Sequence, residues 1–166
     1  TTTLKVFCND SAGFAIYAIG YTNDEYGNNL LHWDGASSAS DTTHDIETNI
    51  YDSTNPTDST WSMKLSAISG TYAATIDDGD STHNNSTEDF TDWHEVPDEY
   101  QRVAYKLSGT DLNTDNNGIG SSITTTYDAY ISTTQPAGLY TGQVKYTLVH
   151  PSTENAPVET INQLVY

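Results

Sequence analysis

Short stretches in which apolar and polar residues alternate recur along the chain, whereas the spacing of an amphipathic helix is almost absent. In 100–107, for example, Val103, Tyr105 and Leu107 share one face of an extended strand. Residues 14–21 are apolar on both faces, as is typical of a central strand between two layers. The pattern predicts strands at 3–7, 14–21, 46–51, 61–68, 72–76, 100–107, 122–131, 139–149 and 161–166.

Clusters of turn-forming residues separate the predicted strands every ~10–20 residues. Loops are expected at 33–45, 77–92 and 110–120, which are rich in Asp, Asn, Ser, Thr and Gly. We therefore expect an all-β fold with little helix, an antiparallel β-sandwich of immunoglobulin-like or jelly-roll-like type. A mostly disordered chain is the alternative, and it fits the long alternations badly. The expected sandwich domain is 1–149, and 150–166 forms a Pro-bounded linker with a strand-like tail.

The balance of charge narrows the possible partners. The chain has 166 residues, of which 23 are acidic and 5 are basic, for a net charge of -18. Such a chain repels phosphate backbones, so we expect no nucleic-acid partner. No apolar run approaches the ~20 residues of a transmembrane helix. Abundant Thr, Ser and Asn with scarce Lys are typical of extracellular bacterial proteins, so we expect an exported chain.

The single cysteine and the start of the chain add to this expectation. Cys8 excludes an internal disulfide, and its apolar-rich surroundings predict a small buried side chain. The sequence begins without a signal peptide or an initiator Met, which predicts a processed chain.

Calcium is the best-motivated metal ligand. Asp111, Asn113 and Asp115 stand at alternate positions, like the first three ligands of an EF-hand loop. The match then breaks, since Asn116 stands where Gly is expected and Ser122 where the bidentate Glu belongs. A calcium site in a sandwich loop remains one interpretation. The alternative, which we favour, is a solvated turn stabilised by local hydrogen bonds. A second acidic cluster with the same two interpretations comprises Asp77, Asp78 and Asp80.

Catalytic motifs do not occur in this sequence. It lacks G-x-S-x-G and G-x-x-x-x-G-K, and its five histidines lack the H-x-x-x-H and H-x-H spacings of zinc sites. With 23 acidic residues, some pair will always match the carboxylate separation of a glycosidase, so that match carries no information. We therefore expect no enzymatic activity and no cofactor other than calcium.

Two tryptophans lie beside loop-like sequence. Exposed Trp33 and Trp93 would be able to stack on sugar rings, as in a carbohydrate-binding module. More often such residues cover the end of a core, and we favour that interpretation. Trp61 opens a predicted strand and is expected in the core.

Three segments resemble a known group of proteins. They are SAGFAIYAIGYTNDEYGNNLL, WSMKLSAISGTYAATI and above all ISTTQPAGLYTGQVKYTLVHP, supported by EVPDEYQRVA and SSITTTYDAY. The chain is similar over roughly 1–151 to secreted or surface proteins of candidate-phylum bacteria, the Saccharibacteria in particular. This resemblance implies export and a β-rich surface domain. It implies no reaction and no catalytic residues.

Both ends of the chain carry strand-like segments. An edge of a β-sandwich is able to accept a strand from another chain, and a head-to-tail contact of that kind makes a fibre. The candidate polymer contacts are Thr3, Leu4, Lys5, Val6, Phe7, Ile161, Asn162, Gln163, Leu164, Val165 and Tyr166. The alternative for each segment is pairing within its own domain.

Two functions follow from these patterns. The first is an extracellular structural protein whose partner is itself, in a filament or surface layer. The second is a monomeric adhesin-like or carbohydrate-binding module that contacts a host or neighbouring cell surface.

Overall fold

The predicted all-β class is confirmed in the part of the chain that the structure describes. The computed structural model describes residues 1–6, 12–22, 25–26, 29–38, 40–50, 58–67, 74–77, 89–107 and 121–150. No helix occurs among these residues, so the described part of the chain contains no helix that could cross a membrane. Their strands are β1 (Thr2–Val6), β2 (Gly13–Thr22), β3 (Glu25–Tyr26), β4 (His32–Trp33), β5 (Glu47–Thr48), β6 (Thr60–Ala67), β7 (Thr75–Ile76), β8 (Gln101–Leu107), β9 (Ser121–Tyr130), β10 (Tyr140–Thr141) and β11 (Gln143–Val149).

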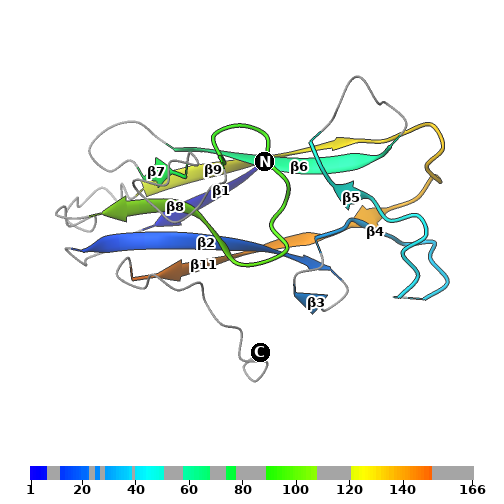
Figure 1. The fold of residues 1–166 in the computed structure, drawn as a ribbon, viewed down its shortest axis with the longest axis horizontal. Coiled ribbons are helices and arrows are strands. Elements are labelled where there is room, and N and C mark those ends of the chain that lie inside the picture. Colours follow the sequence, from blue (N-terminus) through cyan, green and yellow to red (C-terminus); the bar gives the residue numbers. More distant parts are fainter. Residues whose placement is uncertain are drawn as a thin grey trace.

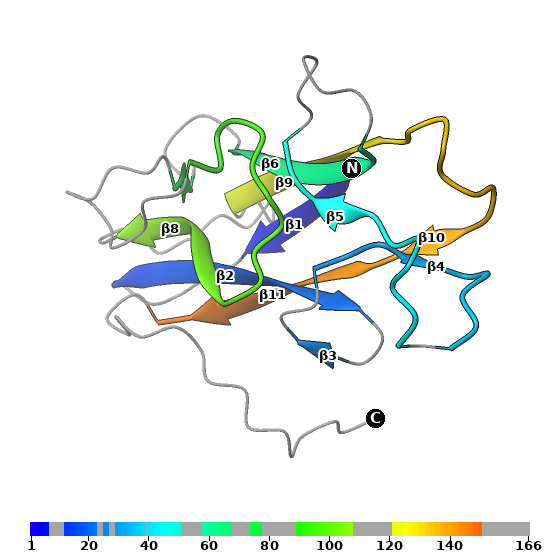
Figure 2. The same cartoon turned by 45° about the vertical axis from the view of Figure 1, so that its right-hand side comes forward.

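The strands form two main layers (Figures 1 and 2). One layer, here called the β9 sheet, has the order β1-β9-β6-β5. The other, the β2 sheet, has the order β11-β2-β8-β7, with β3 pairing to β2. A short ribbon of β10 and β4 makes a third, two-stranded sheet. This arrangement is consistent with the expected β-sandwich, while the immunoglobulin-like or jelly-roll-like subtype stays a prediction.

The core lies between the two layers. Phe14, Met63, Val103 and Ile123, from β2, β6, β8 and β9, are almost completely buried in one cluster. The register between β2 and β8 shifts at Ile16/Tyr17, which is a β-bulge. The bulge explains why two successive residues of β8, Val103 and Ala104, both belong to this core cluster.

One long side of the sandwich is closed by the backbone around Phe90. The Phe90 carbonyl accepts a hydrogen bond from the Leu65 N–H of β6 at 2.8 Å. The Phe90 N–H donates to the Asp77 carbonyl at 2.8 Å, and the Asp77 N–H donates to the Val103 carbonyl of β8 at 3.0 Å. Hydrogen bonds therefore run without interruption from the β9 sheet to the β2 sheet along this side.

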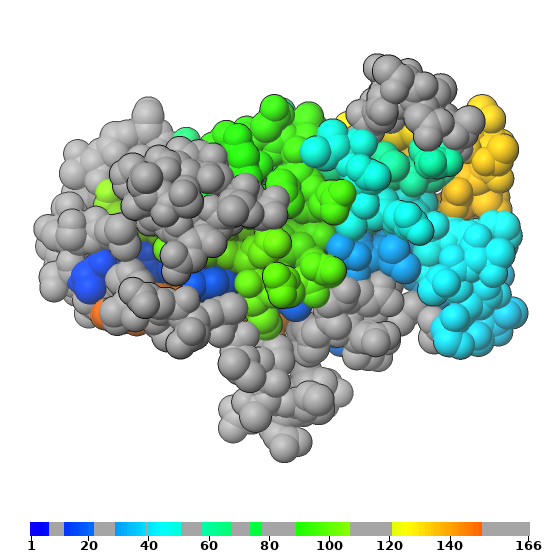
Figure 3. Space-filling view, in the orientation of Figure 1, coloured from blue at the N-terminus to red at the C-terminus, as the bar shows by residue number. Residues whose placement is uncertain are grey.

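The segment between Phe90 and β8 then crosses from one layer to the other, and it covers the middle of the face seen in Figure 3 (green). Val96 N–H donates to Thr48 Oγ1 at 2.6 Å, and the Gly20 N–H of β2 donates to the Pro97 carbonyl at 2.7 Å. A Cβ on Gly20 would lie 2.5 Å from the Asn29 Cβ, so only glycine fits this crossing.

Several predicted boundaries differ from the observed strands. The expected strand 139–149 is two strands, because Gly142 separates β10, which pairs with β4, from β11, which pairs with β2. The expected strand 46–51 reduces to β5, which pairs with β6 in a parallel register. The expected loop 77–92 includes Phe90, which is fully buried in the core.

Candidate functional site

The N-terminal candidate strand pairs within its own chain. β1 is antiparallel to β9, with Leu4 opposite Ile123 and Val6 opposite Ser121. Val6 is buried in the core, Leu4 is half-buried, and the Thr3 and Lys5 side chains are exposed. Phe7 lies outside the described residues. Among those residues β1 pairs with β9 alone, so it forms the outer strand of the β9 sheet.

Other predicted sites fall outside the described part of the chain. These are the C-terminal segment 161–166, the calcium candidates Asp111, Asn113 and Asp115, and two members of the second acidic cluster, Asp78 and Asp80. Among the described residues, no group of three His, Cys, Asp or Glu side chains is placed to hold a metal ion. The calcium site stays a prediction.

Asp77, the first member of the second acidic cluster, forms a buried ion pair. Its carboxylate is completely buried and accepts a hydrogen bond from Arg102 Nε at 3.2 Å. The guanidinium of Arg102, the one arginine of the sequence, also lies 4.6 Å from the centre of the Tyr105 ring. Together these groups lie near Tyr17, whose pKa is raised by burial. Asp77 therefore neutralises the positive charge of the Arg102 guanidinium, which is mostly buried.

Trp33 is half-buried, and neighbouring segments pack against its indole ring. A Cβ on either Gly35 or Gly138 would clash with its indole ring, so glycine backbone lies against the ring from two segments. The ring of His44 contacts it edge-on, at 5.1 Å between centroids. The indole Nε1 is buried and has no hydrogen-bond partner. This packing favours the interpretation of Trp33 as a cover for the end of the fold over that of a sugar-stacking platform.

Trp93 is half-buried, and a cation occupies one face of its ring. Lys64 Nζ of β6 lies 4.5 Å from the ring centroid, a distance typical of a cation–π contact. A sugar would have to stack on the other face or displace Lys64. The glycan-stacking interpretation of Trp93 stays a prediction.

The outer strand of the β2 sheet has an incompletely covered core face. In the register of β11 with β2, Tyr146 stands opposite Ala18 and Leu148 opposite Ile16. Directly opposed residues share a face, and Ala18 and Ile16 belong to the core, so Leu148 points to the interior side. Yet Leu148 is 54% exposed. The sequence alternation places Leu148 on this face, but its exposure depends on β11 lying at the edge.

A chain of hydroxyl groups ties β11 to the opposite layer. The Tyr146 hydroxyl donates to Thr125 Oγ1 of β9 at 3.0 Å and lies 2.8 Å from the Tyr127 hydroxyl. Burial raises the pKa of both phenols, and for Tyr127 the neighbouring Tyr146 raises it further. These hydrogen bonds hold Tyr146, in the middle of β11, against β9. Leu148 follows two residues later in the same strand.

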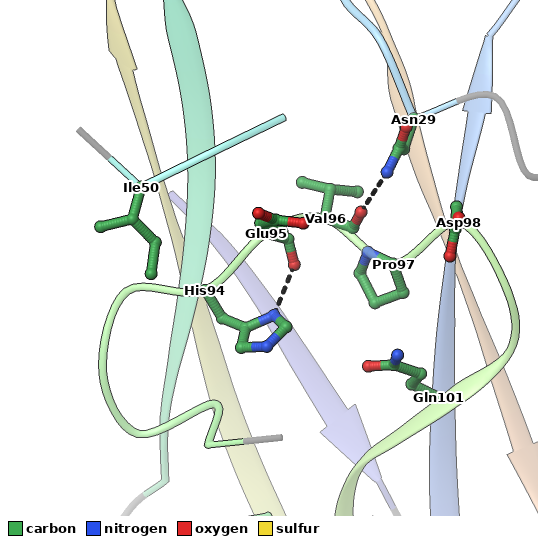
Figure 4. Close-up of a pocket in the computed structure, with 8 residues that line it drawn as sticks. All are labelled: Asn29, Ile50, His94, Glu95, Val96, Pro97, Asp98 and Gln101. Atoms are coloured by element: carbon green, nitrogen blue, oxygen red, sulfur yellow. Dashed lines mark hydrogen bonds between the residues drawn. The ribbon is translucent and has the colours of Figure 1, made fainter. Parts of the chain in front are cut away.

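A polar cavity of about 310 Å³ lies beside the crossing segment (Figure 4). The residues that line it are Asn29, Ile50, His94, Glu95, Val96, Pro97, Asp98 and Gln101. Gln101 Oε1 is buried without a hydrogen-bond partner. This cavity is not predictable from the sequence, because it depends on where 94–101 crosses between the layers.

Comparison of the chain with family models, curated proteins and solved structures finds no match. The resemblance to surface proteins of Saccharibacteria therefore stays a prediction.

Proposed function

We propose that this chain is an extracellular, non-enzymatic structural subunit that assembles with further copies of itself into a filament or surface layer. Assembly proceeds by β-strand addition, with a terminal segment as the donor. The observation that carries the proposal is the difference between the two long sides of the sandwich. One side is joined by the hydrogen bonds of Phe90, and the other ends, among the described residues, on the outer strands β1 and β11.

Outer strands favour this kind of contact for a physical reason. Alternate residues of an edge strand direct their N–H and C=O groups away from the sheet, and another strand satisfies them by pairing. A contact between the edge of one copy and a terminal segment of the next does not close on itself, so it propagates into a fibre.

The C-terminal segment is the favoured donor. β1 already pairs with β9 in its own chain, and Val6 contributes to the core. Its release would expose Val6 and one edge of β9. The segment 161–166 follows a Pro-bounded linker and carries no charged side chain, so it approaches an acidic subunit without adding repulsion.

Deletion of 158–166 tests the proposal. We expect the deleted chain to lose assembly and to keep the thermal unfolding midpoint of the full chain, because the sandwich core lies within 1–149. Solution mass and electron microscopy measure the first effect, and circular dichroism measures the second. A matched control replaces the nine residues by a Gly/Ser segment of equal length. Polymers of unchanged length in the deleted chain would contradict the proposal.

A monomeric binding module is the second candidate, and the cavity beside Gln101 favours it. A buried amide oxygen without a partner suits a small polar ligand that donates a hydrogen bond, such as a sugar hydroxyl. A glycan screen separates the two functions, since a monomer that binds glycans fits the module and a polymer without glycan affinity fits the subunit.

A further inference from the structure

The outer strand β11 leaves part of the hydrophobic core open at its rim. Its interior-facing residues are Val144, Tyr146 and Leu148, and exposure is greatest at Leu148, at 54%. Val144 and Tyr146 are half-buried against the core cluster. An interior-facing leucine with this exposure is a position that another apolar side chain would cover.

The two outer strands, β1 and β11, are not equally suited to pair with an added strand. β1 has five residues, its interior-facing Val6 is buried, and Lys5 on its other face is exposed. A short edge strand offers little backbone for pairing. Lysine does not distinguish the two edges, because β11 carries Lys145 as β1 carries Lys5. β11 has seven residues and exposes an apolar side chain on its interior face. Among the described residues β11 pairs with β2 alone.

We propose that the outer edge of β11, with Leu148 near its C-terminal end as the exposed apolar contact, is the acceptor for segment 161–166 of a second copy. This inference rests on the proposed function and names the surface that the donor occupies. The occupant is taken from a second copy because, in the proposed function, each subunit donates its segment to a neighbouring subunit.

The donor segment suits this edge in length, pattern and charge. Its six residues match the seven of β11, so a ladder is able to run along most of the strand. In an extended strand Leu164 and Tyr166 share one face, which would lie beside Leu148. The segment has no charged side chain, whereas the whole chain carries -18.

The test uses full-length chains with the same substitution at three leucines. Leu148→Lys places a charge on the interior face of β11, Leu164→Lys places one in the donor, and Leu139→Lys is the control. Leu139 is 61% exposed just before β10. We expect the unmodified chain and Leu139→Lys to assemble, and each of the other two variants to remain monomeric with an unchanged unfolding midpoint.

A mixture of the two assembly-deficient variants gives the sharpest readout. Leu148→Lys keeps its donor and Leu164→Lys keeps its acceptor, so an equal mixture should give particles of twice the chain mass and no polymer. If Leu148→Lys lowers the unfolding midpoint, Leu148→Thr replaces it, because threonine keeps the strand propensity and removes apolar contact area.

Three results would overturn the inference. If the Leu148 variants polymerise like the unmodified chain while deletion of 158–166 abolishes assembly, the acceptor is another edge and the proposed function survives. If the mixture gives no dimers, the donor and acceptor are not complementary. If the unmodified chain never assembles, both the proposed function and the acceptor are wrong.

Discussion

At the residue scale, the pair of Asp77 and Arg102 places opposite charges in the interior of the fold. The Asp77 side chain has no exposure to solvent, and that of Arg102 is 17% exposed. Water therefore screens this pair little, unlike the acidic groups on the surface.

Asp77→Asn should destabilise the fold by about 3 kcal/mol, because the change leaves a mostly buried guanidinium without its counter-charge. Asp128→Asn, the same change at an exposed position of β9, should alter the free energy of unfolding by less than about 0.5 kcal/mol. Denaturant titration of the two variants measures the difference. Equal, small effects would show that Asp77 does not stabilise the buried charge.

The hydroxyl chain of Tyr127 and Tyr146 predicts loss of stability at high pH. Burial raises both pKa values above the ordinary 10.0, so the folded chain keeps these protons where the unfolded chain releases them. The unfolded state then binds fewer protons, and stability is complete below about pH 10 and falls above it.

Unfolding measured between about pH 9 and pH 12 should show this decline, and the double variant Tyr127→Phe/Tyr146→Phe should show a shallower one. Absorbance of the folded chain should leave at least three tyrosines, Tyr17, Tyr127 and Tyr146, protonated where a free tyrosine loses its proton. Titration of all twelve tyrosines near pH 10 in the folded chain would contradict the account.

At the element scale, the crossing segment 89–100 joins the two layers on one side. It contains no long strand, yet its backbone bonds to β6, β2 and the residue after β7. Phe90 anchors the start of this segment, because its side chain is fully buried and its backbone bonds to both Leu65 and Asp77.

Phe90→Ala should cost about 3–5 kcal/mol of stability, because it removes a fully buried aromatic ring. Amide exchange should accelerate more at Leu65, whose N–H bonds to Phe90, than at Leu4 of β1, two strands away in the same sheet. Mass-spectrometric or NMR exchange measures both positions. A uniform change at the two amides would contradict a local role for this segment.

The long strands were predictable from the sequence, and the short ones were not. Alternation located β2, β6, β8 and β9 to within one or two residues, because each extends for seven residues or more. β4, β5 and β10 have two residues each, too few for a period of two to be detected. Their positions follow from pairing with distant segments, as does the parallel register of β5 with β6.

The candidate site was predictable only in part. The face on which Leu148 lies follows from the alternation in 143–149, whereas its exposure follows from the order of strands in the sheet. Phe90 was assigned to a loop because its neighbours are acidic and turn-forming, and only contact with β6 and Asp77 reveals it as core.

At the scale of the whole molecule, charge determines the conditions for assembly. The net charge is -18, and in the described part of the chain three basic side chains lie over aromatic rings: Lys64 over Trp93, Arg102 over Tyr105 and Lys145 over Tyr100. Repulsion between copies therefore opposes assembly at low ionic strength, and at about 0.15 M salt the Debye length shortens to about 8 Å.

The central claim is that this chain is built to join copies of itself through an open sheet edge. Negative-stain electron microscopy of the unmodified chain at about 0.15 M salt, with solution mass measured on the same sample, tests it most directly. The account predicts regular filaments or sheets and a mass far above the 18.1 kDa of one chain. A homogeneous monomer across protein concentration and salt would contradict it.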